Sequence, residues 1–308
     1  MKILREFIGK LYTGDPVSFE ELNIMPVFSR EEQRLPYLEL DEALKAGLAE
    51  ITEVSEGGIV PELEVGNKSA SDIIILDGEE LVGAKQNRVV NATIVVPAHA
   101  RVKIPVSCVE QGRWRYTSRE FATGDSFLYP SLRQRKLRDV TGSLRAGGGL
   151  GSDQSGIWQD ISLKSERLHV TSDTMSMSDI FQTSVADESD RELRMEITHQ
   201  ERQVGFVAFI RGGFAGGDLF GSPELCRRKL HKLLRSYYLD SLDRAASFPF
   251  VSVRQILEQV QAAKQEEFST VGKGTDLRFE GADVQGAWKL VDNFIPHLMV
   301  FPKGTNHD

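Results

Sequence analysis

The chain has 308 residues, of which 40% are hydrophobic and 27% are charged, and its formal net charge is -8. This composition is ordinary for a globular protein and leaves enough apolar side chains for one large domain or two smaller ones, which excludes a disordered chain. The acidic balance provides no basic footprint for duplex DNA or RNA, so we do not expect a nucleic-acid partner.

Residues 1–19 are predicted to form an amino-terminal helix. Ile3, Phe7, Ile8 and Leu11 share one face of it, so we expect it to pack against the rest of the chain. The segment is too charged for the core of a signal peptide, and no segment approaches the roughly 18 apolar residues that a membrane span needs. We therefore expect a cytoplasmic protein with no membrane partner.

Residues 20–120 are predicted to be rich in β-strands, because short apolar runs alternate there with turn residues. A short helix is predicted at 41–46, with Asp41 as its N-cap and Gly47 as its stop. The predicted strands span 21–28, 48–54, 59–65, 73–76, 79–83, 89–96 and 101–106.

Asp77 and Gly78 separate two of these apolar strands. An Asp-Gly pair in this position is typical of a two-residue hairpin turn, because both central residues must reach positive φ. Gly83, at the end of the predicted return strand, would permit a bulge or the close approach of another backbone.

Residues 126–202 change to the apolar period of helices. Helices are predicted at 131–144, at 153–168 and over most of 176–202. The glycine-rich segment 145–151 is interpreted as a flexible connector, since it lacks the lysine of a phosphate-binding GxxxxGK[ST] loop. The basic residues of the first helix are predicted to form a solvated face.

Residues 203–302 mix strands and helices. A hairpin is predicted around Gly212 and Gly213, and Ser222 followed by Pro223 is a strong helix start. The predicted elements are hairpin strands 204–210 and 214–220, helices 222–243 and 252–264, and strands 275–280, 285–291 and 297–301.

These elements predict an α+β fold. Its β-rich amino-terminal half should form antiparallel, sandwich-like sheets, followed by a helical middle and a mixed part of hairpin, helix and strands. No linker rich in proline or serine separates these parts. We therefore predict a single compound domain over 20–302, with two tightly packed halves as the alternative, and a disordered tail at 303–308.

The strongest local anomaly is the polar stretch 79–88, which follows an apolar strand. The stretch contains two carboxylates, an amine, two amides and a guanidinium at a place where strands of a sheet should pair. Burying such groups costs free energy unless they bind each other or a ligand. Glu79 and Glu80 are candidate catalytic residues, and in an extended strand they would point to opposite faces. The candidate ligand-binding residues are Lys85, Gln86, Asn87 and Arg88. A solvated edge hairpin with salt bridges is the alternative.

Four further candidates lie near helix starts. Asp153 is a candidate catalytic residue, and Gln154 and Trp158 on the same predicted helix are candidate ligand-binding residues. Asp218 lies close to a helix N-terminus, where a carboxylate is favoured, and is also a candidate ligand-binding residue. For each of them a purely structural role, such as helix capping, is the alternative.

The histidines and cysteines form no metal-binding pattern. The six histidines show no HxH, HExxH or HxxxH pair, and Cys108 and Cys226 are far apart in the sequence. Cys108 lies in an apolar run and is predicted to be a small buried hydrophobe, as is Cys226. We predict no metal site and no cofactor.

Several segments together resemble one prokaryotic family. They are Leu76–Arg88, Ile104–Trp114, Ser152-Asp153-Gln154 with Trp158, Asp218–Glu224 and Leu233–Tyr237. From about residue 20 to 302 the chain resembles the ADP-ribosylglycohydrolase- and rhodanese-phosphatase-superfamily-associated protein domain family. The glycine run 147–151 and the polar region 183–200 depart from the family's pattern.

The resemblance implies that the chain binds or processes an NAD-derived or ADP-ribosyl nucleotide in a prokaryotic stress or conflict pathway. Cations would hold its phosphates, an indole would stack on its base, and carboxylates with an amide would hold ribose hydroxyls or activate water. The cations for the phosphates would be Lys85 and Arg88, and the indole for the base would be Trp114 or Trp158. The groups for the ribose hydroxyls or for water would be Glu79 or Glu80, with Asn87 and Asp153.

Two alternatives stay open. In the first, the chain is a non-enzymatic regulatory or scaffold partner of a defence or ADP-ribosylation system, and 77–88 is a buried polar network. In the second and weaker one, the basic helix 133–145 binds nucleic acid. The expected partner is a nucleotide-type small molecule or another protein, and whether the chain is an enzyme is left open.

Overall fold

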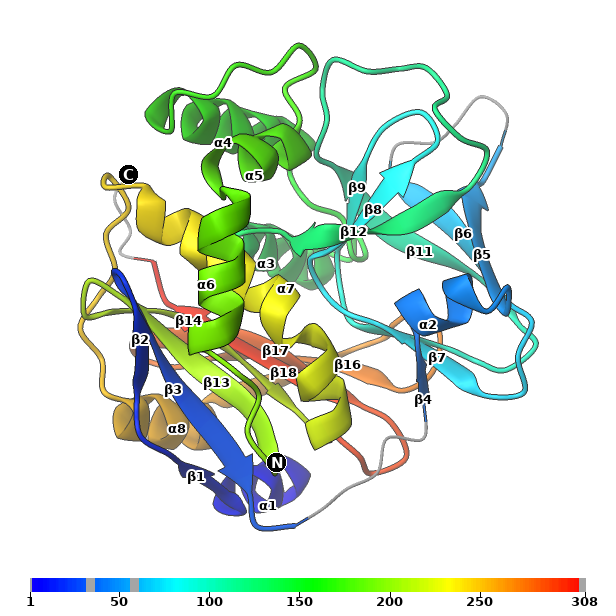
Figure 1. The fold of residues 1–308 in the computed structure, drawn as a ribbon. Helices are drawn as coiled ribbons and strands as arrows, with labels where there is room; N and C mark the ends of the chain where they lie inside the picture. Colours follow the sequence, from blue (N-terminus) through cyan, green and yellow to red (C-terminus); the bar gives the residue numbers. More distant parts are fainter. Residues whose placement is uncertain (1, 32–36, 56–60, 305–308) are drawn as a thin grey trace. The chain divides into compact units, whose positions relative to one another are not determined.

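The computed structural model describes residues 2–31, 37–55 and 61–304 (Figure 1). This part of the chain is an α+β fold of helices and mainly antiparallel sheets, and its amino-terminal half is rich in strands, so the predicted fold class is confirmed. The start of the strand predicted at 59–65 and the tail beyond Gly304 lie outside the described residues.

The described residues group into two compact units. The nine-stranded unit takes its described residues from 1–35, 187–269 and 274–308, and the two-sheet unit takes them from 36–186 and 270–273. Whether the two form one compound domain stays a prediction.

The nine-stranded unit is built on one antiparallel sheet. Its order is β1-β3-β13-β14-β18-β17-β16-β15, with β2 paired to β3. The strands are β1 (Leu11–Thr13), β2 (Val17–Phe19), β3 (Leu22–Ser29), β13 (Gln203–Ile210), β14 (Gly213–Phe220), β15 (Lys264–Phe268), β16 (Thr275–Glu280), β17 (Val284–Leu290) and β18 (His297–Pro302). The predicted hairpin is confirmed, since β13 pairs with β14 across a turn at Arg211 and Gly212, both with positive φ.

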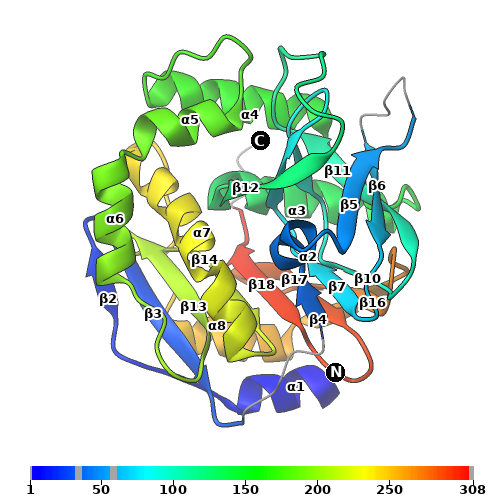
Figure 2. The ribbon, with the colours of Figure 1, turned by 45° about the vertical axis from the view of Figure 1, so that its right-hand side comes forward.

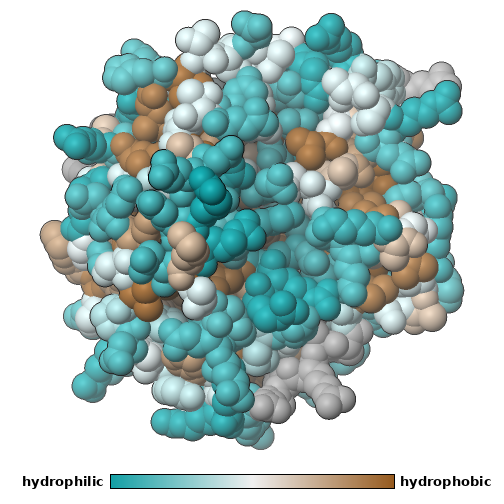
Figure 3. Space-filling model, in the orientation of Figure 1, coloured by the Kyte–Doolittle hydropathy of each residue, from teal (hydrophilic) through white to brown (hydrophobic). Residues whose placement is uncertain are grey.

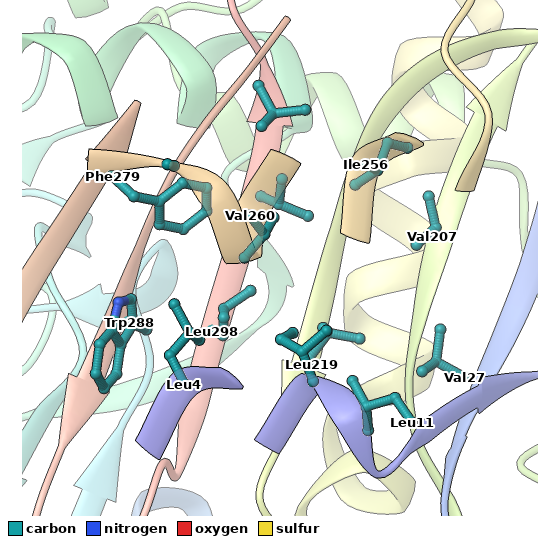
Figure 4. Packing of buried hydrophobic residues seen from close by; sticks show 14 of the residues in the cluster. Leu4, Leu11, Val27, Val207, Leu219, Ile256, Val260, Phe279, Trp288 and Leu298 are labelled. Atoms are coloured by element: carbon teal, nitrogen blue, oxygen red, sulfur yellow. The ribbon is translucent and has the colours of Figure 1, made fainter. Parts of the chain in front are cut away.

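Two helices cover one face of this sheet, α1 (Lys2–Gly9) and α8 (Val253–Ala262). Figure 4 shows Leu4 of α1 and Val260 of α8 in the apolar layer that also contains Leu298 of the sheet. The expected packing of the amino-terminal helix is therefore confirmed, because its apolar face is buried in this core.

The amino-terminal helix is shorter than predicted, however. It ends at Gly9, and β1 and β2 follow in the segment predicted as helix up to residue 19. Gly14 and Pro16 are turn residues that interrupt a helix, and pairing with β3 satisfies the backbone of the strands on either side. Leu11 still joins the core, as the amphipathic pattern requires.

The long helix α7 (Pro223–Leu242) lies on the opposite face of the sheet from α8, as Figures 1 and 2 show. The predicted N-cap is confirmed, since the Ser222 hydroxyl accepts hydrogen bonds from N–H groups of the first turn. The rings of Tyr237 and Phe206 meet edge to face between α7 and the sheet. The remaining helix of this unit is α6 (Asp187–Glu196), which packs on α7.

The two-sheet unit contains a three-stranded sheet, β10-β7-β4, and a six-stranded sheet, β12-β8-β9-β11-β6-β5. Its strands are β4 (Tyr37–Glu39), β5 (Ala49–Glu53), β6 (Glu62–Asn67), β7 (Asp72–Ile75), β8 (Glu79–Gly83), β9 (Arg88–Val90), β10 (Ile94–Val96), β11 (Arg101–Cys108) and β12 (Phe121–Phe127). All pairs are antiparallel except β4 with β7. One buried core contains Ile73 and Ile94 of the smaller sheet and Val65, Leu81 and Ile104 of the larger, as expected for sandwich-like sheets.

Four helices complete this unit: α2 (Leu40–Lys45), α3 (Pro130–Arg145), α4 (Gln154–Arg167) and α5 (Met177–Ser184). The prediction that Asp41 is the N-cap of α2 is wrong. Glu39 holds that position, and the Asp41 carboxylate instead accepts hydrogen bonds from Lys45 and Thr123 within the folded unit. Gly47, with φ +68, follows the helix as predicted.

The strand predicted at 89–96 is broken into β9 and β10, which belong to different sheets. Asn91 and Thr93 lie in the break, where the Asn91 amide donates to the Leu150 carbonyl oxygen and the Thr93 hydroxyl accepts from the Asp77 N–H. These long-range hydrogen bonds replace the ladder bonds of a continuous strand. Strands β4, β12 and β15 were not predicted.

The surface gives no sign of a bilayer-spanning helix. Among residues 2–31, 37–55 and 61–304, no helix is long and apolar enough to cross a membrane. On the face drawn in Figure 3, hydrophilic side chains predominate and hydrophobic ones form small separate groups.

Candidate functional site

The polar stretch 79–88 folds as a hairpin, which consists of β8, a loop and the start of β9. β7 pairs with β10 and β4 rather than with β8, so the hairpin predicted at Asp77-Gly78 is wrong. These two residues form a turn that leads from the smaller sheet to the larger one. The true hairpin loop is 84–87, which places three of the candidate ligand-binding residues at its tip.

Two residues with positive φ open this loop, Gly83 at +133° and Ala84 at +40°. A Cβ atom on Gly83 would lie 2.6 Å from the carbonyl oxygen of Glu120, so the close backbone approach predicted for this glycine is confirmed. The loop conformation therefore depends on glycine at this position.

The carboxylates of Glu79 and Glu80 are both buried. The Leu76 N–H donates to Oε2 of Glu79 (3.2 Å), and the Ser178 hydroxyl donates to Oε1 of Glu80 (2.7 Å). The two side chains thus bind different elements, as expected for neighbours in a strand. A Cβ atom on Gly124 of β12 would lie 2.6 Å from Oε2 of Glu80, so β12 closes tightly over it. The catalytic roles of both glutamates stay predictions.

The amides of Gln86 and Asn87 fasten the loop to the segment after β11. The Asn87 N–H donates to Oε2 of Glu110 (3.0 Å), and the Gln86 side-chain amide donates to the Glu110 carbonyl oxygen (2.8 Å). Arg113 completes the network, since its Nη2 donates to Oδ1 of Asn87 and its Nε to Oε1 of Glu110. Glu110 and Arg113 were not singled out from the sequence, although both lie in the block 104–114 that carries the family resemblance.

Lys85 lies between two aromatic rings of the loop that follows β11. Its Nζ is 5.3 Å from the ring centroid of Trp114 and 5.1 Å from that of Tyr116. Lys85 is 9% exposed, whereas Trp114 is 50% and Tyr116 51% exposed. A buried ammonium group is therefore bordered by two aromatic rings that are half open to solvent.

Arg88 is fully buried at the start of β9. Its Nη1 donates to Oε1 of Gln86 (3.1 Å) and more weakly to the Asn87 carbonyl oxygen (3.5 Å). Its Nε and Nη2 have no hydrogen-bond partner among the described residues. No salt bridge joins Arg88 to a carboxylate in the described part of the chain.

Cys108 is the cross-strand neighbour of Arg88, on β11. Its sulfur lies 3.2 Å from Oε1 of Gln86 and 3.2 Å from the Glu110 carbonyl oxygen, so its single S–H proton is shared between these two acceptors. Burial raises the pKa of the Cys108 thiol, and the charge of Arg88 and a contact with the Trp158 indole lower it by less. The buried position predicted for Cys108 is confirmed, but no signal in the sequence placed it beside the polar stretch.

Helix α4 brings Gln154 and Trp158 to the same region. The Gln154 side chain brackets the Cys108 backbone, accepting from its N–H and donating to its carbonyl oxygen, each at 2.8 Å. The Trp158 indole N–H is buried and faces the Cys108 sulfur, a weak acceptor, without a hydrogen bond of normal geometry to the described residues. Asp153 is the N-cap of α4, where it accepts from the Ser155 N–H, and its carboxylate also faces Arg135 at 3.6 Å. Its predicted catalytic role stays a prediction.

The solvated face predicted for the basic helix is wrong for two of its residues. Arg133 and Lys136 of α3 are buried, because the Asp77 carboxylate lies 3.0 Å from Nζ of Lys136 and 3.8 Å from Nε of Arg133. Lys136 also donates to the Val90 carbonyl oxygen (2.7 Å). A buried charge needs such partners, and the sequence did not show that Asp77 would supply them.

Asp218 belongs to the other unit, where it lies in β14 of the nine-stranded sheet. Its carboxylate binds Nε2 of His297 (3.1 Å) and accepts from the Tyr237 hydroxyl (3.3 Å). Neither partner was predicted, since both are distant in sequence. The predicted ligand-binding role of Asp218 stays a prediction.

A search of the described residues for three or more His, Cys, Asp or Glu side chains that could hold one metal ion finds no such group.

A family model described as the ARG and Rhodanese-Phosphatase-superfamily-associated Protein domain matches residues 10–301. The match spans nearly the whole chain and confirms the family that the sequence segments indicated. No curated protein and no solved structure matches the chain.

Proposed function

This chain belongs to the ARG and Rhodanese-Phosphatase-superfamily-associated Protein domain family, and we propose that its two-sheet unit binds an NAD-derived or ADP-ribosyl nucleotide. The family's description associates it with ADP-ribosylglycohydrolases, whose chemistry concerns such ligands. The proposed setting is NAD metabolism in a prokaryotic stress or defence pathway.

The observation that carries this proposal is the position of Lys85 between Trp114 and Tyr116. An NAD-derived nucleotide combines an anionic diphosphate with a flat base. An ammonium group attracts the first, and half-exposed aromatic rings offer stacking surface for the second. The proposed site is therefore the rim formed by these three side chains.

Binding is better supported than catalysis. Glu79 and Glu80 are buried and already accept hydrogen bonds, so neither carboxylate faces solvent from which a substrate could approach. The proposed function of the chain is therefore to bind the nucleotide, with hydrolysis as a separate question. Incubation with NAD or ADP-ribose, followed by chromatography of the products, answers whether either ligand is also hydrolysed.

The direct test is calorimetric titration of the protein with ADP-ribose and with NAD. We expect micromolar binding of at least one of them. Trp114→Ala should weaken it by roughly 1–3 kcal/mol, the usual contribution of one stacked ring. Phe250→Ala is the matched control, because Phe250 is 83% exposed and lies in the nine-stranded unit. The absence of heat with both ligands at millimolar concentration would refute the proposal.

A second candidate function is that of a non-enzymatic regulatory or scaffold partner. The observation in its favour is that the Gln86 and Asn87 amides and the Glu80 carboxylate all bind other parts of the same unit. In that case Glu80→Ala or Lys85→Ala should unfold the protein. A variant that melts like the wild type but no longer binds nucleotide would decide for the first candidate.

A further inference from the structure

The guanidinium group of Arg88 lacks a counter-charge among the residues that the structure describes. Arg88 is fully buried, and its hydrogen bonds go from Nη1 to Gln86 and to the Asn87 carbonyl oxygen. A charge removed from water is costly unless it is paired and hydrogen-bonded. No carboxylate of the described segments pairs with it.

The two nitrogens of Arg88 that have no partner in the described segments, Nε and Nη2, form one edge of the planar guanidinium. Two parallel N–H groups on such an edge match the two oxygens of a carboxylate, phosphate or sulfate. The edge used internally is a different one, because Gln86 binds Nη1. The edge of Arg88 best suited to an oxyanion is therefore buried without a hydrogen-bond partner among the described residues.

A third buried donor lies nearby. Arg88 and Cys108 donate to the same oxygen, Oε1 of Gln86, at 3.1 and 3.2 Å, so the guanidinium and the thiol lie next to each other. The Trp158 indole N–H faces the Cys108 sulfur, a weak acceptor, and makes no hydrogen bond of normal geometry with the described residues. Trp158 is only partly buried, so it connects this cluster of donors with the surface.

Cys108 itself does not supply the missing negative charge. Burial is the largest influence on the thiol and raises its pKa above the ordinary value of 9.0, so the thiol is neutral at pH 7. Glu110, whose carbonyl oxygen also binds Gln86, has its carboxylate already bound to Arg113 and to the Asn87 N–H. The counter-charge has to come from outside the described residues.

We infer that Arg88 and Trp158, beside Cys108, form a binding site for a phosphate-type oxyanion. Arg88 holds two oxygens through Nε and Nη2, and the Trp158 N–H donates to a third. The inference does not depend on the proposed nucleotide site at Lys85, and it stands or fails separately. The oxyanion is either a free inorganic ion or the phosphate group of a larger molecule.

The test uses the full chain and the reaction of its cysteines with N-ethylmaleimide, followed site by site by mass spectrometry. Both cysteines are buried, Cys108 in the two-sheet unit and Cys226 in the nine-stranded unit. Inorganic phosphate should slow alkylation of Cys108 with a saturable, roughly tenfold effect, which corresponds to about 1.4 kcal/mol. Alkylation of Cys226 should not change, and sodium chloride at equal ionic strength should protect neither.

Trp158→Phe is the decisive variant, because it removes one N–H group and keeps an aromatic ring. We expect it to weaken protection by phosphate about tenfold, and Trp114→Phe to leave protection unchanged. Arg88→Met should abolish protection, but the conclusion does not depend on this variant, since loss of a buried charge can also unfold the chain.

Three results would overturn the inference. The first is no protection of Cys108 by phosphate or sulfate, or equal protection of both cysteines. The second is protection by ADP-ribose alone, which would make Arg88 part of the nucleotide site and not a site for a free oxyanion. The third is alkylation of Cys108 with a pH midpoint below 7, which would make its thiolate the counter-charge of Arg88.

Discussion

Glu110 is the residue on which the geometry of the candidate site most depends. Its carboxylate accepts hydrogen bonds from Nε of Arg113 (2.8 Å), from the Asn87 N–H (3.0 Å) and from the Thr174 hydroxyl (3.1 Å). Burial alone would raise the pKa of the Glu110 carboxyl, but the hydrogen bonds and the charge of Arg113 outweigh it and lower the pKa.

We expect Glu110→Gln to destabilise the protein by roughly 3–5 kcal/mol at pH 7, because Arg113 would be left buried and unpaired. Since the folded pKa is depressed, the contribution of Glu110 is complete above the unfolded pKa of about 4.3 and is lost as the pH falls through the folded pKa. The variant should therefore lose less stability on acidification than the wild type. Urea denaturation at a series of pH values measures both effects.

Glu224→Gln is the matched control for this prediction. Hydrogen bonds from Arg227 and Arg228 lower the pKa of Glu224 to about 2, but its side chain is 47% exposed. Exposed ion pairs contribute little in water, so we expect a loss below about 1 kcal/mol at pH 7. Equal losses in the two variants would contradict the assignment of a buried network to Glu110.

The residue types in the sequence were enough to locate the candidate site at 79–88. They did not show which residues would form hydrogen bonds with it. A run of carboxylates, amides and cations between apolar strands signals either a ligand or an internal network. Which of the two applies to Asn87 and Gln86 depends on Glu110 and Arg113, more than twenty residues away in the sequence. That pairing is a property of the folded chain.

At the scale of elements, the turn residues of the sequence predicted a different hairpin from the one that strand pairing produces. Asp77-Gly78 forms a turn, as its composition predicts, but no hairpin, because the edges of β7 are taken by β10 and β4. The hairpin forms where β8 meets β9, around a loop that follows Gly83. Turn propensity fixes where the chain can reverse, while competition among strands fixes which strands pair.

Gly83→Ala tests this hairpin. The φ of +133° is rarely adopted by residues with a side chain, and the new Cβ would lie 2.6 Å from the Glu120 carbonyl oxygen. We expect a loss of more than about 2 kcal/mol, from backbone strain and the contact together. The measurement is the midpoint of urea denaturation at constant slope.

Gly142→Ala provides the contrast. Gly142 lies in α3, and a Cβ atom there would meet no atom within 4 Å. Alanine favours a helix over glycine by roughly 0.5–1 kcal/mol, so this variant should be more stable than the wild type. If the two substitutions change stability in the same direction, the strained loop at Gly83 is not as described.

On the scale of the whole molecule, the nine-stranded unit is assembled from segments distant in the sequence. β3 pairs with β13, and β18 from the carboxyl-terminal end lies between β14 and β17 (Figure 2). Leu298 and Val300 of β18 are buried in the apolar core. Without β18, therefore, no strand joins β14 to β17, and the sheet is divided into two parts.

A chain truncated after Pro296, which lacks β18, should not form this unit. Burial of the two core side chains, Leu298 and Val300, contributes roughly 1.5–3 kcal/mol each, and the backbone hydrogen bonds to β14 and β17 are lost as well. The free energy of unfolding of a protein is only about 5–15 kcal/mol, so these losses are large beside it. The measurement is thermal unfolding by circular dichroism with limited proteolysis. A chain ending at Gly304 is the control, and a truncated chain that melts like this control would contradict the central role of β18.

The sequence by itself determined the fold class, the family and the positions of most helices and strands, because these follow from apolar periodicity, caps and turn residues within short windows. It also marked 79–88 as unusual. Only the tertiary structure decided that Asp77 pairs with Lys136 and that Glu110 and Arg113 bind the loop 84–87. It also decided that Arg88 is buried beside Cys108 and Trp158. Buried polar groups need hydrogen-bond partners, and the packing of helices and strands decides which groups come close enough to be those partners. The separation of two residues in the sequence does not show whether they will meet.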